Sequence, residues 1–233
     1  MTIRAKLYAA IALTVLGPLA TTAVALHGMS ELGTSFDEVR ARAAHEAVAR
    51  QLKFLVTDVN GWQTAYGYAG EERRQREEAR QEYVRAEGEL ESELEVASDT
   101  FADPRERQLL AGLERDFGGF RDLDATAYRA LRAGDEQRTK RILLGPEIEQ
   151  FEAMAATAEE LAAHEAERAS ATDRAFDDAR DDARRRLIAV ALGAALVIVL
   201  LLVTAGDIAR MALEGERSAR KRRPDEPPGS GPS

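Results

Sequence analysis

The sequence predicts an all-α protein, an antiparallel up-down-up-down four-helix bundle flanked by two transmembrane helices. Two uncharged apolar stretches of about twenty residues, 7–26 and 187–206, are each long enough to cross ~30 Å of hydrocarbon as a helix. Between them, apolar residues recur at helical spacing, and no stretch shows the alternation of a strand. Turn signals divide this region into four long segments, and their short connections force neighbouring helices to run antiparallel.

The first apolar stretch follows Arg4 and Lys6 and is interrupted only by Gly17-Pro18. It is interpreted as a retained transmembrane helix with a kink at the proline, because it exceeds the roughly 7 to 15 apolar residues of a signal peptide. A cleaved signal peptide is the alternative, since Ala23-Val24-Ala25 resembles a cleavage site.

Two retained spans place both termini on the same side of a cell membrane. Basic residues lie near both ends of the chain, so this side is expected to be the cytoplasm and the bundle to be extracytoplasmic. Arg184, Arg185 and Arg186 would then lie outside, which long translocated segments tolerate. The predicted parts are a cytoplasmic N-terminus (1–6), a first span (7–26), the bundle (27–186), a second span (187–206), and a short basic cytoplasmic helix with a disordered Pro-rich tail (207–233).

The first bundle helix is predicted over 27–69. Its apolar residues follow steps of three and four, as in a coiled coil, with one skip after Ala43. Gly67 and Gly70 end it, and Glu71-Glu72 is expected to supply an acidic first turn for the second helix. The seam comprises Leu32, Phe36, Val39, Ala43, Val48, Leu52, Leu55, Val59, Trp62, Tyr66 and Ala69.

The remaining helices are delimited by similar local signals. Asp103-Pro104 starts the third helix, with Asp as its cap and Pro in its first turn, and Gly134 ends it. Residues 135–146 are expected to form a short helical arm. The fourth helix begins at Glu147 and continues without proline through the second span. Its alanine-rich seam comprises Ile148, Phe151, Ala155, Ala158, Ala162, Glu165, Ala169, Thr172, Phe176, Ala179 and Ala183.

The predicted helix lengths are unequal, which bears on the oligomeric state. The first and fourth helices outrun the middle pair, leaving a two-helix stalk of some ~15 to 20 Å above the membrane. Two helices alone bury little apolar surface. We therefore expect two chains to complete the stalk as a homodimer.

The composition excludes several classes of function. The formal net charge is -9, and the region between the charged ends carries about -12, so nucleic-acid binding is not expected. The chain has no cysteine, which removes disulfides, thiol nucleophiles and thiolate metal sites. It also lacks a glycine-rich phosphate loop and a nucleophile motif. The protein is interpreted as a non-enzyme without a cofactor.

Two histidines, His45 and His164, each precede a glutamate, Glu46 and Glu165. A metal or haem site would need these ligands at one level of the bundle, but counting residues places them roughly 7 Å apart along the helices. They are therefore interpreted as ordinary surface or seam histidines, and no metal site is predicted.

Aromatic residues gather toward one end of the predicted bundle. Counting from the turns places Trp62 and Tyr66 at heights similar to those of Tyr83 and Tyr128. Two interpretations stay open, core aromatics with polar tips or a ligand pocket between helices. The pocket interpretation names as candidate ligand-binding residues Asn60, Trp62, Gln63, Tyr66 and Tyr128.

The run Asp58-Val59-Asn60-Gly61-Trp62-Gln63-Thr64-Ala65-Tyr66, between two spans, resembles the four-helix-bundle sensor module of bacterial methyl-accepting chemotaxis receptors, in particular the actinobacterial type. The resemblance covers about residues 1–206. It implies a ligand-sensing homodimer that signals by small displacements of its last helix. The HAMP linker and the cytoplasmic signalling hairpin of that family do not fit into the final 27 residues.

The leading hypothesis is a membrane-anchored sensor that binds a small ligand or a protein in its bundle and passes the change inward to a separate signalling partner. Mixed dimerisation with a full-length receptor is one route, because Ala189 and Gly193, small residues four apart, permit close helix contact. The alternative is a structural or adaptor protein whose bundle scaffolds other membrane proteins without a ligand. Thermal melting in the presence of candidate ligands separates the two.

Overall fold

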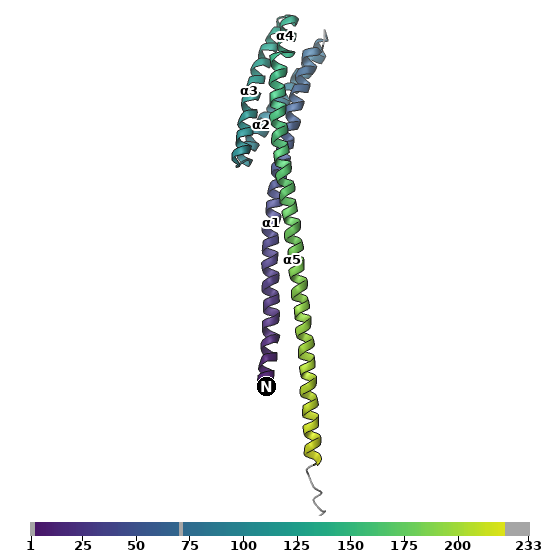
Figure 1. Ribbon diagram of the computed structural model, residues 1–233. Coiled ribbons are helices and arrows are strands. Elements are labelled where there is room, and N and C mark those ends of the chain that lie inside the picture. The colour runs from purple at the N-terminus through teal and green to yellow at the C-terminus, as the bar shows by residue number, and fades with distance from the viewer. Residues whose placement is uncertain (1–2, 70–71, 222–233) are drawn as a thin grey trace, which may run out of the picture. The chain divides into compact units, whose positions relative to one another are not determined.

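The computed structural model describes residues 3–69 and 72–221, and these residues form α-helices joined by short connections (Figure 1). No strand occurs among them, so the predicted all-α class is confirmed. The predicted Pro-rich tail, 224–233, lies outside the described residues. The helices are α1 (Ile3–Tyr68), α2 (Arg73–Thr100), α3 (Pro104–Arg132), α4 (Glu136–Leu143) and α5 (Pro146–Lys221).

The chain divides into two compact units. The apolar unit comprises Met1–Gly33 and Asp178–Ser233, and the core unit comprises Thr34–Asp177. The apolar unit therefore contains the beginning of α1 and the end of α5, while the core unit contains the rest of both helices together with α2, α3 and α4.

One hydrophobic cluster fills the core unit, and α1, α2, α3 and α5 all contribute to it. The predicted seams of the first and fourth helices supply part of it, including Leu52 and Val59 of α1, which are fully buried. Leu143 of the short helix α4 is also buried, and it lies so close to α1 that a Cβ atom on Gly67 would be 2.6 Å from its Cδ1 atom. A larger residue at Gly67 would therefore require the Leu143 side chain to move.

Two levels of the core unit each combine side chains from α1, α2, α3 and α5. At one level, Tyr66 of α1 packs on Tyr83 of α2 and Tyr128 of α3, and the nearby Gln63 bonds to Glu147 of α5. At the other level, His45 of α1 packs on Phe101 at the end of α2 and approaches Glu106 of α3 and Glu165 of α5.

The helix ends agree with the sequence signals except at the start of α2. Asp103 forms a capping box with Glu106 at the start of α3, and Gly134, with φ of 77°, follows its end. The expected acidic first turn of α2 is wrong, because α2 begins at Arg73 and its first turn contains no acid. Glu72 is the N-cap residue, and its side chain makes no capping hydrogen bond. Glu71 lies outside the described residues.

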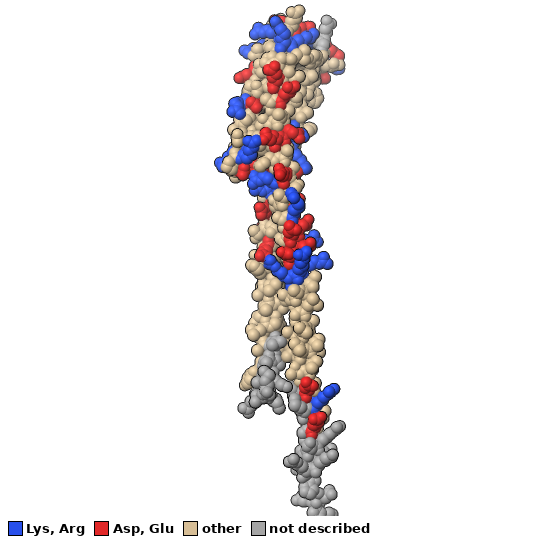
Figure 2. Space-filling view, in the orientation of Figure 1, with Lys and Arg blue, Asp and Glu red and all other residues tan. Residues whose placement is uncertain are grey.

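Among the described residues, one helical stretch within Glu136–Asp207 is long and apolar enough to cross a membrane. None of its apolar segment is buried inside the structure. It is part of the tan zone that charged residues border in Figure 2. The predicted first span is helical as part of α1. A groove of about 700 Å³ separates the two segments, and Gly17 and Pro18 of α1 line it opposite Gly193 of α5.

Candidate functional site

The tyrosine cluster consists of Tyr66, Arg80, Tyr83, Asp124 and Tyr128. The Arg80 guanidinium lies among the three aromatic rings, with its Cζ atom 5.0, 4.4 and 4.3 Å from the ring centroids of Tyr66, Tyr83 and Tyr128. Its Nη1 atom donates to Oδ2 of Asp124 over 2.6 Å. The buried carboxylate is therefore neutralised by a cation that the rings also attract.

Two tyrosine hydroxyls of this cluster differ in their partners. The Tyr66 hydroxyl donates a hydrogen bond to Oδ1 of Asp124, whereas the buried Tyr83 hydroxyl makes no hydrogen bond within the described residues. Burial, with a further contribution from Asp124, raises the pKa of both hydroxyls far above the usual range, so both remain neutral donors. The cluster thus contains one buried donor available to a guest molecule or to water.

Glu147 of α5 is the acidic neighbour of this cluster. Only 1% of its surface is exposed, and its Oε1 atom accepts a hydrogen bond of 2.7 Å from Nε2 of Gln63. Burial, followed by the charge of Asp124, raises the pKa of the carboxyl group to about 8. The sequence did not identify Glu147 as a site residue, because an acid in the first turn of a helix is a common feature of helix starts.

The predicted ligand-binding residues fall into two groups. Gln63, Tyr66 and Tyr128 lie in or beside the tyrosine cluster, as the counted heights predicted. Asn60 and Trp62 are half-buried on α1, and Trp62 lines a shallow hollow of about 320 Å³ together with Phe54, Thr57, Asp58, Gly61 and Ala65. A Cβ atom on Gly61 would meet nothing within 4 Å, so the glycine leaves this hollow open.

Tyr128 also lines a larger hollow of about 970 Å³ at the start of α2, the arginine-lined hollow. Arginines at this end of a helix are unfavourable, because the uncapped backbone N–H groups already carry partial positive charge. The combination of these N–H groups and guanidinium groups favours a small anion. The lining residues are Arg73, Arg74, Arg76, Glu77, Tyr128, Leu131 and Arg132.

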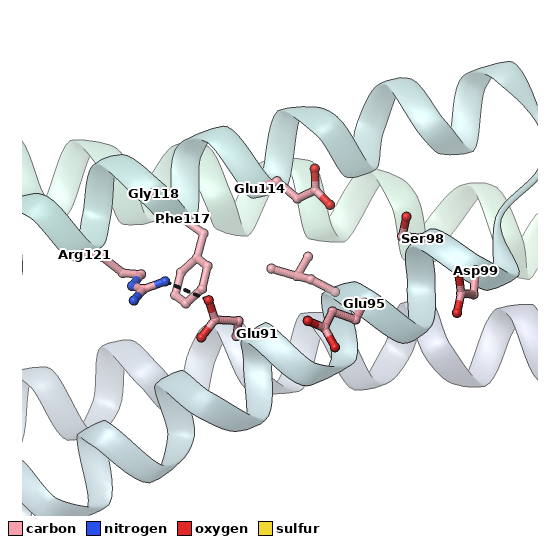
Figure 3. A pocket seen from close by; sticks show the side chains of 9 residues that line it. Glu91, Glu95, Ser98, Asp99, Glu114, Phe117, Gly118 and Arg121 are labelled. Carbon is pink, nitrogen blue, oxygen red and sulfur yellow. Dashed lines mark hydrogen bonds and ion pairs between the residues drawn. The ribbon is translucent and has the colours of Figure 1, made fainter.

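An acidic groove of about 580 Å³ runs between α2 and α3 (Figure 3). Leu94 and Phe117 line its apolar part, and Arg121 at one end is paired with Glu87 and Glu91. The remaining carboxylates belong to exposed residues and are well solvated. This groove suits a cationic group rather than an anion. Its carboxylates belong to Glu91, Glu95, Asp99 and Glu114.

His45 and His164, which the sequence places at different heights, both approach Glu165. Nδ1 of His45 lies 3.7 Å from Oε2 of Glu165, and Nε2 of His164 lies 3.9 Å from its Oε1. Counting residues compares backbone heights, whereas the long glutamate side chain reaches between the two rings. Glu165 is completely buried, at a position that the sequence places on the seam of the helix.

No known family model matches the chain, and no curated protein or solved structure shows a significant similarity to it. The resemblance to chemotaxis-receptor sensors therefore stays a prediction from the sequence, and function must be inferred from geometry.

Proposed function

We propose that the chain is a two-pass membrane sensor. In this proposal the core unit is an extracytoplasmic, antiparallel four-helix bundle that works as a homodimer, and ligand binding passes through the second span to a separate partner.

Contacts at the two levels of the core unit support the antiparallel order. On α1 the histidine level (His45) comes before the tyrosine level (Tyr66) in the sequence. The order is the same on α3, where Glu106 comes before Asp124. On α5 the order is reversed, because Glu147 at the tyrosine level comes before Glu165 at the histidine level. The same reversal holds along α2, where Phe101 packs on His45 and Tyr83 packs on Tyr66. Short connections give this order in up-and-down bundles.

The continuity of α5 is the observation that carries the proposal. Pro146–Lys221 is a single helix whose second residue, Glu147, is buried beside the tyrosine cluster and whose later part contains the apolar stretch 187–206. A displacement of an ångström or two along such a helix is sufficient for signalling if a partner distinguishes the two positions.

The arginine-lined hollow supports a small anion, such as a carboxylate or phosphate, as the ligand class. Tyr128 borders this hollow and packs edge-on against Tyr66, with ring centroids 5.8 Å apart. Tyr66 donates to Asp124, whose charge acts on Glu147. A ligand that shifts Tyr128 therefore alters the packing and the electrostatic environment of the first turn of α5.

The test uses the full chain in lipid nanodiscs, with acetate, succinate, citrate, glutamate and inorganic phosphate as probes. Because the chain has no cysteine, Ala189→Cys introduces a single thiol into the second span. At constant ionic strength, a binding anion is expected to change both the Trp62 fluorescence and the yield of disulfide-linked dimer. The double variant Arg73→Gln/Arg132→Gln should abolish both responses, and Arg107→Gln, an exposed arginine outside the hollow, should retain them.

Two results would count against this function. A fluorescence response that persists in the Arg73→Gln/Arg132→Gln variant would place the anion elsewhere. Binding without any change in the Ala189→Cys crosslink would favour the scaffold hypothesis, because the second span would then not respond to the ligand.

A further inference from the structure

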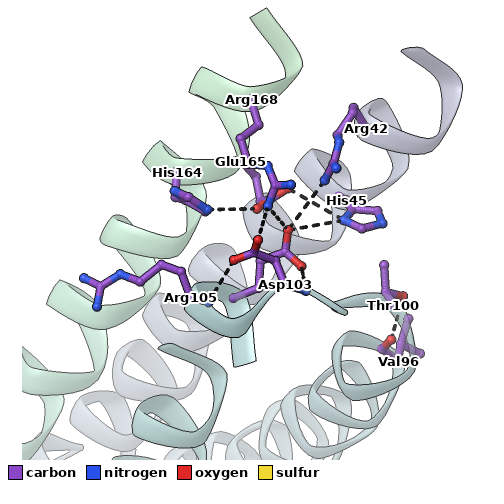
Figure 4. A network of polar contacts seen from close by, with 10 residues as sticks. Arg42, His45, Val96, Thr100, Asp103, Arg105, His164, Glu165 and Arg168 are labelled. Carbon is purple, nitrogen blue, oxygen red and sulfur yellow. Dashed lines mark hydrogen bonds and ion pairs between the residues drawn. The ribbon is translucent and has the colours of Figure 1, made fainter. Parts of the chain in front are cut away.

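The histidine–glutamate cluster, consisting of His45, Glu106, His164 and Glu165, is the second polar group in the core unit (Figure 4). One ligand atom each from His45, Glu106 and Glu165 lies within 4.8 Å of the others. Nδ1 of His45 is 3.8 Å from Oε1 of Glu106 and 3.7 Å from Oε2 of Glu165. These three residues come from three helices, α1, α3 and α5.

Four buried polar atoms of this cluster have no hydrogen-bond partner within the described residues. Both carboxylate oxygens of Glu165, Nδ1 of His45 and Nε2 of His164 are buried and make no hydrogen bond. Glu165 is 0% exposed and Glu106 is 1% exposed. Buried polar groups without partners are costly, and here both oxygens of one carboxylate and the two imidazole nitrogens that face it are without one.

Two of the three residues are held in place by other contacts. Oε2 of Glu106 accepts the backbone N–H of Asp103 over 3.0 Å within the capping box of α3. The His45 ring packs edge-on against Phe101, with centroids 5.6 Å apart. These contacts fix the directions of the side chains in advance, which lowers the cost of binding a metal ion.

Three carboxyl groups and two guanidinium groups surround the cluster. Nη1 of Arg168 donates to Oε1 of Glu106 over 2.6 Å, and Nη1 of Arg42 lies 3.6 Å from the same oxygen. Asp103 lies 3.5 Å from Arg168. The three carboxyl groups are those of Asp103, Glu106 and Glu165. A carboxylate oxygen that binds a metal commonly accepts a hydrogen bond as well, so Arg168 is compatible with such a role for Glu106.

We propose that His45, Glu106 and Glu165 bind a divalent transition-metal cation of the zinc type. A point equidistant from three atoms with these separations lies about 2.1 to 2.5 Å from each, close to the ~2.0 to 2.2 Å of zinc bonds to nitrogen and oxygen. A mixed set of imidazole and carboxylate ligands favours such ions over magnesium and calcium, which prefer oxygen alone. This site does not depend on the proposed sensor function.

His164 has a supporting position in this proposal. Its Nε2 atom faces Oε1 of Glu165, whereas His45 faces Oε2. When Oε2 binds the metal, a protonated Nε2 of His164 donates a hydrogen bond to the other oxygen and fixes the carboxylate. Partners of this kind contribute a smaller factor to metal affinity than the ligands themselves.

The test titrates the full chain in detergent, without a histidine tag, with Co²⁺ and then with competing Zn²⁺. We expect one Co²⁺ per chain, a visible absorption band typical of nitrogen and oxygen ligands, displacement by Zn²⁺, and no displacement by Mg²⁺. His45→Ala and Glu165→Gln should lower the affinity more than 100-fold, and His164→Ala about 10- to 100-fold. His27→Ala is the matched control, because His27 is exposed and lies in the apolar unit.

Glu165→Gln keeps the size of the side chain and removes its charge, so folding of this variant, checked by circular dichroism, separates loss of binding from loss of structure. The absence of a Co²⁺ band in the unmodified chain would overturn the proposal. Equal Co²⁺ affinity of His45→Ala and the unmodified chain would also overturn it. A silent titration together with a raised melting temperature of Glu165→Gln would show that Glu106 and Glu165 share a proton instead.

Discussion

Glu147 is a carboxyl group in a protein core, where ionisation is costly unless a cation or several donors compensate it. Gln63 supplies one donor to Oε1, while Oε2 accepts no hydrogen bond within the described residues. The guanidinium of Arg80 is already paired with Asp124. The group is therefore held in its neutral form at pH values at which an exposed glutamate is ionised.

This protonation predicts that the stability of the protein depends on pH. The pKa of Glu147 is about 8 in the folded chain against an ordinary value of 4.5. The folded state retains the proton between these values and the unfolded state does not. The stabilising contribution of this proton is thus fully present below about pH 4.5 and is lost as the pH rises through 8. We expect Glu147→Gln, which is neutral at every pH, to remove as much as ~4 kcal/mol of this dependence.

The measurement compares melting temperatures of the unmodified chain, Glu147→Gln and Glu149→Gln at pH 5 and pH 8.5. Glu149 is exposed and lies two residues away on the same helix, so its variant should follow the unmodified chain. An unchanged pH dependence in Glu147→Gln would show that Glu147 ionises normally in the folded state.

At the residue scale, the sequence predicted the aromatic grouping but not its polar partners. The heights of Tyr66, Tyr83 and Tyr128 follow from counting residues between turns, and their rings do pack together. Asp124, in contrast, resembles any surface acid in the sequence, because nothing local indicates that it faces Tyr66, 58 positions away. A glutamate at a seam position, such as Glu165, was the stronger signal of a buried polar cluster.

Helix starts show how local chemistry determines an element. The Asp103 side chain accepts a hydrogen bond from the backbone N–H of Arg105 over 2.8 Å, and the Glu106 side chain accepts one from the backbone N–H of Asp103. α3 therefore begins where the sequence predicted. α2 has no such cap. It begins at Arg73, so Glu72 is its N-cap residue and not part of its first turn. Local motifs therefore predict the start of a helix well when a side chain there forms hydrogen bonds with the free backbone N–H groups.

The cap at Asp103 is expected to contribute measurable stability. Asp103→Ala removes the acceptor for the first turn of α3 and should lower the free energy of unfolding by about 0.5 to 2 kcal/mol. Asp103→Ser keeps an acceptor oxygen and should recover most of this loss. Thermal melting of the two variants beside the unmodified chain measures the difference, and equal losses in both would assign the effect to the contact with Arg168 instead.

At the scale of the whole molecule, one exposed stripe of α1 fits the proposed homodimer. Phe54 is 60% exposed, and with Asp58, Gly61, Trp62 and Ala65 it follows the spacing of a single helix face. A large exposed apolar side chain beside an open glycine is suited to contact with a second helix. The sequence predicted dimerisation from helix lengths alone and did not identify this surface.

Phe54→Lys should weaken the dimer, because it introduces a charge into the proposed contact. Val84→Lys is the matched control, since Val84 of α2 is 53% exposed and lies away from the stripe. Chemical crosslinking of lysines and light scattering in detergent report the dimer fraction. If Phe54→Lys and Val84→Lys dimerise to the same extent, α1 does not form the interface.

Glu147 and Glu165 occupy related positions on α5. They are eighteen residues apart, and at about 100° per residue this separation is five complete turns, so both acids lie on the same side of the helix about 27 Å apart. Torsion of α5 about its axis therefore withdraws both carboxyl groups from their clusters together, whereas a bend between them disturbs one and spares the other. A stimulus that twists α5 would therefore disturb both clusters together, and a stimulus that bends it would disturb one of them alone.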